Sequence, residues 1–334
     1  MGASDEQPAQ GPPLHVIATY PVDGQGTNAL LDADCDAPTP DCPVPTNPEL
    51  ELRFDRFLLP TGGLAAAVRL YSGYPPANGV ALKARYDLIE RVVVLRPTRS
   101  LQPHTLYTVE VAVGPDPSRG FWAFDHAPLE EGAVPLRFSF TTGGGPRPAS
   151  APAAETPKDT CATISAGPLA SCVTCHRTTP SSAPPMGLDL ASAQGFLATA
   201  VARVAHETET GDTITGPALR SPPRFGVRMA VVDPGSPATS YLMYKLLQKP
   251  ENFRLDPSEP ACETGYQAPV DTGGCTAPDP DELARLREWF VRGDPMPQDP
   301  QTSDLAGVPT SLTRADLLRI SGWIEQGAVC APTH

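Results

Sequence analysis

Short runs of alternating apolar and polar residues mark the first part of the chain. Residues 50–54, 107–113 and 136–140 alternate in this way, and 92–94 is apolar throughout. Turn-forming residues separate these runs at 21–26, 61–63, 75–79 and 114–120. A period of two is that of a strand with one buried face, and several short strands between turns are typical of a sandwich. We therefore predict an all-β sandwich domain over residues 12–145.

The apolar period changes to 3.6 in the second part of the chain. Helices are expected over 189–207, from Pro237 behind a Ser236 cap, from Asp279, and from Thr313 to Gly327. A Gly-, Pro- and Ala-rich stretch at 146–160 is typical of a semi-extended linker. These features predict an all-α domain over residues 161–334.

One pentapeptide in the second part carries specific chemistry. Cys172, Cys175 and His176 form Cys-x-x-Cys-His, the attachment signature of a c-type haem. Two thiols three positions apart can each add to a haem vinyl group, and the following imidazole then reaches the iron. Half of a zinc site and a thioredoxin-like redox pair are the alternatives. The sequence offers neither a second Cys-x-x-Cys or His-x3-His nor a βαβ pattern around the motif.

Six further cysteines accompany the motif: Cys35, Cys42, Cys161, Cys262, Cys275 and Cys330. An even number fits three disulfides and an oxidising compartment. Proximity favours Cys35–Cys42, Cys262–Cys275 and, at the two ends of the α domain, Cys161–Cys330. Six cysteines allow fifteen connectivities, so this pattern is one hypothesis among them.

Charge and hydropathy narrow the classes of partner. A formal net charge of −13 argues against nucleic acids and anionic membranes, and could steer a basic redox partner. No run of about 18 apolar residues predicts a transmembrane segment. We expect an exported protein, periplasmic or at the cell surface. Its first residues are expected to be the start of a mature segment. A lipid anchor trimmed from the N-terminus stays open.

Several motifs of the β region resemble a known family. Tyr20-Pro21-x-Asp23-Gly24 is followed by alternating residues from Leu101 to Val109 and by Phe138-x-Phe140-Thr141-Thr142-Gly143. This series resembles the bacterial Ig-like domains of secreted and surface proteins, and implies a spacer or docking module without chemistry of its own. Three histidines of this region lack ligand spacing and are expected to be ordinary sheet or loop residues: His15, His104 and His126.

A second resemblance begins at the Cys-x-x-Cys-His motif. Residues 187–190, 232–242, Met296-Pro297 and 312–328 follow it in that order. The series resembles the single-haem cytochrome c domains appended to large secreted bacterial proteins. The resemblance implies one covalent haem c, with His176 and Met296 as its axial ligands. The usual Met-Pro-Pro reads Met-Pro-Gln here, and 250–278 looks like an insertion.

The sixth iron ligand has rivals in the sequence. Met296 lies between two prolines whose restricted backbone can hold a thioether in place. Met243 falls on a predicted amphipathic helix and is expected to pack in the core. Met186 follows His176 by only ten residues, a short path around the haem edge. Met229 stays open, and His206 would give bis-histidine ligation.

Two other sets of residues have both a haem-related and an ordinary interpretation. Trp289 and Trp323 are expected in the core more often than beside a cofactor. Three arginines near prolines could pair with haem propionates, or could simply be solvated: Arg220, Arg224 and Arg228.

Three functions are compatible with this sequence. The leading hypothesis is a non-enzymatic electron carrier with redox protein partners. A haem enzyme with an open sixth position is the second, although no distal His–Arg pair stands out. The third is a surface or filament protein in which the haem is secondary. Donor, acceptor, reduction potential and oligomeric state are not encoded in any motif.

Overall fold

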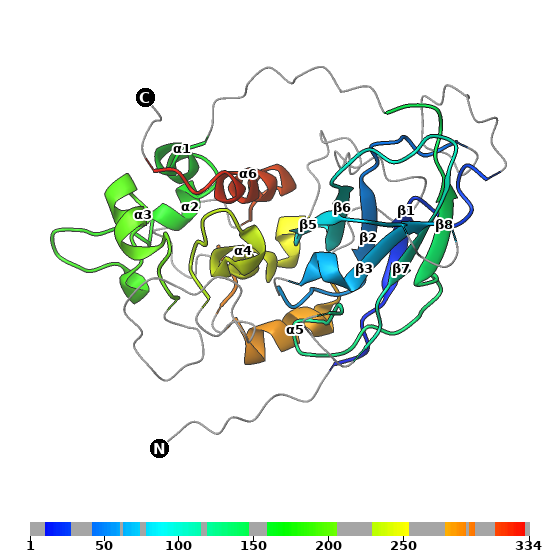
Figure 1. Ribbon diagram of the computed structural model, residues 1–334. Coiled ribbons are helices and arrows are strands. Elements are labelled where there is room, and N and C mark those ends of the chain that lie inside the picture. The colour runs from blue at the N-terminus through cyan, green and yellow to red at the C-terminus, as the bar shows by residue number, and fades with distance from the viewer. Residues whose placement is uncertain are drawn as a thin grey trace. The chain divides into compact units, whose positions relative to one another are not determined.

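The computed structural model describes residues 11–27, 42–60, 63–73, 78–114, 119–146, 159–205, 229–253, 278–291, 294–297 and 311–330. These residues belong to two compact units, called here the β unit (11–146) and the helical unit (159–330) (Figure 1). The predicted linker lies mostly outside the described residues, so the predicted domain boundaries stay a prediction. Within the described ranges, no helix is both long and apolar enough to cross a bilayer.

The β unit is a sandwich of two four-stranded antiparallel sheets, which confirms the predicted all-β class. The first sheet has the order β1 (Val16–Tyr20), β2 (Leu50–Phe54), β6 (Val92–Pro97), β5 (Leu82–Asp87). The second has the order β4 (Asn78–Val80), β3 (Val68–Ser72), β7 (Leu106–Val111), β8 (Arg137–Thr141), with the short helix η1 (Leu64–Ala67) before β3.

The sandwich core comes from the alternating positions read in the sequence. Leu52 and Phe54 of β2 are fully buried, and Phe54 packs on Phe121 with ring centroids 5.0 Å apart. Tyr107 of β7 stacks on Phe140 of β8 at 5.8 Å, so the facing residues of the second sheet close their side of the core. The expected turn at 75–79 ends earlier than predicted, because residues 78–80 pair with β3.

The three histidines of the β unit occupy sheet-end and loop positions, as expected. His15 Nδ1 lies 3.0 Å from Asp55 Oδ2, just before β1. His104 and His126 lie in loops and have positive φ angles, 48° and 63°.

The helical unit contains six α-helices among the described residues: α1 (Cys161–Ala166), α2 (Ala170–Val173), α3 (Ala193–Thr199), α4 (Tyr241–Leu247), α5 (Pro280–Trp289) and α6 (Arg314–Glu325). Three short 3₁₀ helices join them: η2 (Pro185–Gly187), η3 (Pro237–Thr239) and η4 (Pro250–Phe253). An all-α second part is therefore confirmed.

Two predicted helix starts are confirmed by their caps. The Asp279 side chain accepts a hydrogen bond from the Asp281 amide at the start of α5. Thr313 and Asp316 form a reciprocal capping box at the start of α6, and Gly327 follows the end of that helix at φ +99°.

Two other helix predictions need correction. The helix expected over 189–207 is confined to α3, because the Ala202 and Ala205 amides donate instead to Val232 and Met229 carbonyls. The helix expected from Pro237 is interrupted after η3, and α4 begins only at Tyr241. There the Tyr241 amide donates to the Ala230 carbonyl, a bond across the fold that replaces the continuing helical one.

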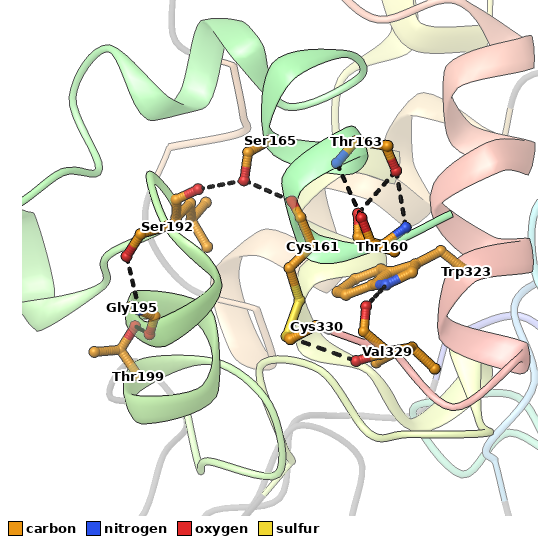
Figure 2. Close-up of a disulfide and its surroundings, with 12 residues drawn as sticks. Thr160, Cys161, Thr163, Ser165, Ser192, Gly195, Thr199, Trp323, Val329 and Cys330 are labelled. Atoms are coloured by element: carbon orange, nitrogen blue, oxygen red, sulfur yellow. Dashed lines mark hydrogen bonds between the residues drawn. A yellow bond between two sulfur atoms is a disulfide. The ribbon is translucent and has the colours of Figure 1, made fainter. Parts of the chain in front are cut away.

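The Cys161–Cys330 disulfide closes the helical unit, as proximity predicted (Figure 2). The two Cα atoms lie 4.5 Å apart, and the Cys161 amide donates to the Val329 carbonyl. Trp323 of α6 is buried, donates to that same carbonyl through Nε1, and meets Phe196 edge-on. Cys42 is also disulfide-bonded, whereas the other cysteines of the two remaining predicted pairs lie outside the described residues.

Candidate functional site

The Cys-x-x-Cys-His segment is one helical turn at the end of α2. The His176 amide donates to the Cys172 carbonyl at 2.8 Å, so these two residues lie one above the other along the turn. Cys172 is buried (8% exposed), Cys175 is exposed, and neither is in a disulfide. Burial raises the pKa of the Cys172 thiol to about 11. A free Cys172 thiol is therefore mostly protonated at neutral pH and is a weak nucleophile.

A cavity of about 740 Å³, its open mouth included, lies against this turn. Its described lining residues are Cys172, His176, Met186, Leu188, Leu190, Thr199, Ala205, Val231, Tyr241, Leu242, Lys245, Leu246 and Met296. Most of this surface is apolar. The other side chains bring an imidazole, a thiol, two thioethers, one amine and the hydroxyl groups of Thr199 and Tyr241 to a single cavity.

The segment that follows α2 holds the His176 turn in place through hydrogen bonds. The Leu190 amide donates to the His176 carbonyl at 2.9 Å, and the Leu190 carbonyl accepts from Ser165 Oγ at 2.7 Å. Ser165 belongs to α1, and its hydroxyl proton is shared with the Cys161 carbonyl, 2.8 Å away (Figure 2). The two contacts of Ser165 connect the segment that holds the His176 turn to the disulfide-bearing helix.

Asp189 supplies the second tie to the same turn. Its carboxylate accepts from Thr178 Oγ1 at 2.6 Å and from the Ala191 amide at 3.0 Å. The Thr178 bond is the main reason why the pKa of Asp189 is lowered. Gly195 of α3 passes so close that a Cβ there would lie 2.6 Å from the Asp189 side chain. The Gly-Leu-Asp-Leu motif therefore acts structurally, by orienting the His176 turn.

The Met296 segment is held by α4 and η4. The Met296 amide donates to the Lys245 carbonyl at 3.2 Å, and Lys249 Nζ donates to the Pro297 carbonyl at 2.8 Å. Asn252, fully buried, donates from Nδ2 to both the Leu246 carbonyl (2.7 Å) and the Met296 carbonyl (3.2 Å). Its Oδ1 accepts from the Leu312 amide at 2.8 Å, so one side chain joins α4, the methionine segment and the start of α6.

The structure brings most of the sequence-derived site residues together. Cys172, His176 and Met296 line the same cavity, and Cys175 lies on the same turn with its side chain exposed. Met186 lines the cavity as well, at 55% exposure and with φ +53°, so the short path from His176 does not keep it away. It is the methionine that sequence reasoning undervalued.

Other candidates fall elsewhere. Met243 and Met229 are fully buried and are not among the lining residues; for Met243 this is the predicted core position. Trp323 packs in the core against Phe196. The remaining candidates lie outside the residues or side chains that the structure describes: His206, Arg220, Arg224, Arg228 and the Trp289 side chain.

Sequence reasoning missed Lys245 as a cavity residue. The pattern contained a signal: Lys245 follows Tyr241 by one helical turn, so the two residues lie on the same side of the predicted amphipathic helix. A lysine inside an apolar stripe was not weighed as part of the site.

A conventional metal cluster is not available as an alternative in the described residues. No three or more His, Cys, Asp or Glu side chains gather there with metal-binding geometry. A four-ligand zinc site around Cys172 and Cys175 would therefore need ligands from outside those ranges.

Comparisons with known proteins leave the site to be judged on its own geometry. No protein-family model matches the chain, and no curated protein matches it. Three solved structures of parts of the bacterial S-layer protein SbsC match 44% of the chain, over the β-rich N-terminal part. They are 10–11% identical to it, with TM-scores of 0.25 to 0.27, and the chain covers 16–28% of their length. At these values the likeness carries no argument about function.

Proposed function

We propose that the chain is an exported electron carrier whose helical unit is a cytochrome c domain with one covalent haem. The observation that carries the proposal is that Cys172, His176 and Met296 line one apolar cavity. Met296 lies 124 positions after Cys172 in the sequence, so the fold brings these side chains together. An imidazole and a thioether are the axial donors of electron-transferring haems.

The residues fit a covalent haem in kind and in place. Cys172 and Cys175 would hold it through thioether bonds, His176 would be the proximal ligand, and Met296 the opposite one. When bound, the haem iron supplies reversible one-electron chemistry, gaining one electron from a donor and losing it to an acceptor. A high pKa does not exclude Cys172 from attachment, because in exported cytochromes that step is performed by dedicated machinery.

The chain's own residues have the tasks of orienting ligands and excluding water. The Ser165–Leu190–His176 bonds fix the proximal turn, while Asn252 and Lys249 fix the backbone around Met296. The apolar lining from Leu188, Leu242 and Leu246 keeps the site dry, which favours a ligated iron that exchanges electrons and not substrates. No arginine or second histidine is among the described lining residues, which disfavours peroxide chemistry at the distal side.

The Cys161–Cys330 disulfide supports export to an oxidising compartment. The β unit would then serve as a spacer or docking module, as its resemblance to Ig-like domains implies. The electron donor and acceptor are redox proteins whose identity the site does not encode.

The test is an intact mass and visible spectrum of the full chain co-expressed with haem-attachment machinery. The mass should exceed that of the polypeptide by one haem and should survive denaturation. Replacing both Cys172 and Cys175 with alanine should abolish the added mass. The matched control, Cys161→Ala with Cys330→Ala, removes two other cysteines and should retain it. A haem extractable by acidic organic solvent, or bound zinc, would overturn the proposal.

A further inference from the structure

Lys245 contributes a cationic side chain to the residues that line the cavity. The residue lies on α4, is only 7% exposed, and is the one lysine or arginine among the described lining residues. Burying an ammonium group costs free energy unless it meets compensating polar or charged groups. The location of this side chain therefore calls for an explanation beyond packing.

Part of the compensation comes from the protein. Lys245 Nζ donates to the Asp294 carbonyl at 3.3 Å and lies 5.9 Å from the centroid of the Tyr241 ring, which also lines the cavity. These contacts hold the amine beside the methionine segment, whose Met296 amide bonds to the Lys245 carbonyl. Lys245 thus lies next to the proposed distal ligand and lines the cavity that the cofactor would occupy.

A neighbouring lysine separates the two roles that Lys245 could have. Lys249 lies one helical turn further on, is 6% exposed, and donates through Nζ to the Pro297 carbonyl at 2.8 Å. Both lysines anchor the same segment, yet Lys249 is not among the cavity-lining residues. Holding the methionine segment does not by itself require a lysine that lines the cavity, because Lys249 holds the same segment without lining it.

We propose that Lys245 is the cationic contact for the acidic side groups of the cofactor, and that its charge raises the reduction potential. The inference rests on the proposed haem function. A haem carries two carboxylates, and a positive charge in an apolar wall both pairs with them and favours the reduced iron, which has one positive charge fewer. Lys245 is therefore a positioning and tuning residue and not an iron ligand.

The experiment compares reduction potentials of the haem-loaded full chain. Lys245→Met keeps the length of the side chain and removes its charge, and Lys245→Arg keeps a charge. Lys249→Met is the matched control, since it removes an equally buried charge just after the end of the same helix. We expect Lys245→Met to lower the midpoint potential clearly more than Lys249→Met does, and Lys245→Arg to restore most of the shift. The ferric near-red band of methionine ligation should persist in Lys245→Met and Lys245→Arg.

The outcomes separate this inference from the proposed function. Equal shifts in the Lys245→Met and Lys249→Met variants, or no shift in either, would overturn the tuning role while leaving the haem function intact. Loss of the near-red band in Lys245→Met would show that the lysine acts only by holding the Met296 segment, and would also overturn it. A wild-type chain that acquires no covalent haem would overturn both.

Discussion

The two units of this chain solve the burial of polar groups in different ways. The β unit satisfies its backbone through the ladders of two sheets and pairs its buried charges with each other, as in Arg56–Asp125 at 2.8 Å. The helical unit has α-helices of 4 to 12 residues, most of them too short to be stable alone. Side chains such as Ser165, Asn252 and Lys249 there bond to the backbone of other segments.

This difference indicates where function is carried. The β unit closes its core with its own residues, whereas the helical unit turns apolar residues of α4 toward a cavity and fixes the surrounding segments one by one. A few bonds between segments therefore control the geometry of the site. Changes in the two units should be separable, and each of the following variants tests that separation.

The largest effect is expected from breaking the buried ion pair of the β unit. Arg56→Ala leaves the Asp125 carboxylate, which has no exposed surface, without its 2.8 Å partner. We expect a loss of about 3–5 kcal/mol in the free energy of unfolding of the β unit, with the haem spectrum unchanged. Urea denaturation followed by β-sheet and haem signals measures both. The control Arg69→Ala removes an exposed pair with Glu110 and should cost less than about 1 kcal/mol. Coupled loss of both signals would contradict independent units.

The disulfide of the helical unit should rank next. Replacing Cys161 and Cys330 with alanine opens a loop of 169 residues and should cost about 2–4 kcal/mol, confined to the helical unit. Urea denaturation of oxidised wild-type and variant proteins gives the difference. An unchanged unfolding transition of the helical unit would show that this disulfide does not stabilise it. Peptide mapping that finds Cys161 and Cys330 as free thiols in the wild type would show that the disulfide does not form.

Asn252→Ala should weaken the methionine segment more locally. It leaves three backbone groups without a side-chain partner: those of Leu246 and Leu312, which are buried, and that of Met296, which is partly buried. We expect a loss of about 2–3 kcal/mol and a weaker near-red band. Gln194→Ala, at an exposed position on α3, should change stability by less than about 0.5 kcal/mol. Equal effects of the two variants would show that the Asn252 side chain does not connect α4, the methionine segment and the start of α6.

The smallest effect concerns acid stability at the start of α1. Asp159 accepts hydrogen bonds from Arg319 of α6, at 2.6 Å in the shortest case, and this partner lowers the pKa of the carboxylate. A lowered native pKa gives stability that is present above the unfolded pKa near 4 and is lost as the pH falls through the native value. Arg319→Ala should therefore reduce stability at pH 6–7 by less than about 1 kcal/mol, and the difference should shrink below pH 4. A deficit that persists unchanged at pH 3 would contradict the ion pair as its source.

Much of the fold was predictable because local patterns and tertiary contacts agree. Alternation at 50–54 and 136–140 matches β2 and β8, and the Thr313 and Asp279 caps start α6 and α5. The prediction was wrong at 200–205 and just after Thr239, where backbone amides such as those of Ala202 and Tyr241 bond to residues 229–232. Apolar periodicity does not report such competing bonds.

The sequence predicted the candidate haem-binding residues, but it did not predict all of the other residues that line the cavity. Cys172, Cys175 and His176 follow from a short motif, and Met296 from a resemblance. Met186 reaches the cavity only through the folded path of the chain, which the spacing of residues along the sequence does not give, whereas helical spacing places Lys245 beside Tyr241. Met186 is therefore the alternative distal ligand that must be tested beside Met296.

The most direct test of the account is the ferric near-red spectrum of the haem-loaded full chain with Met296→Ala and, separately, Met186→Ala. The account predicts a weak charge-transfer band in the wild type and in Met186→Ala, and its loss in Met296→Ala together with ready binding of cyanide or carbon monoxide. A Met296→Ala spectrum identical to that of the wild type, or loss of the band in Met186→Ala alone, would contradict it.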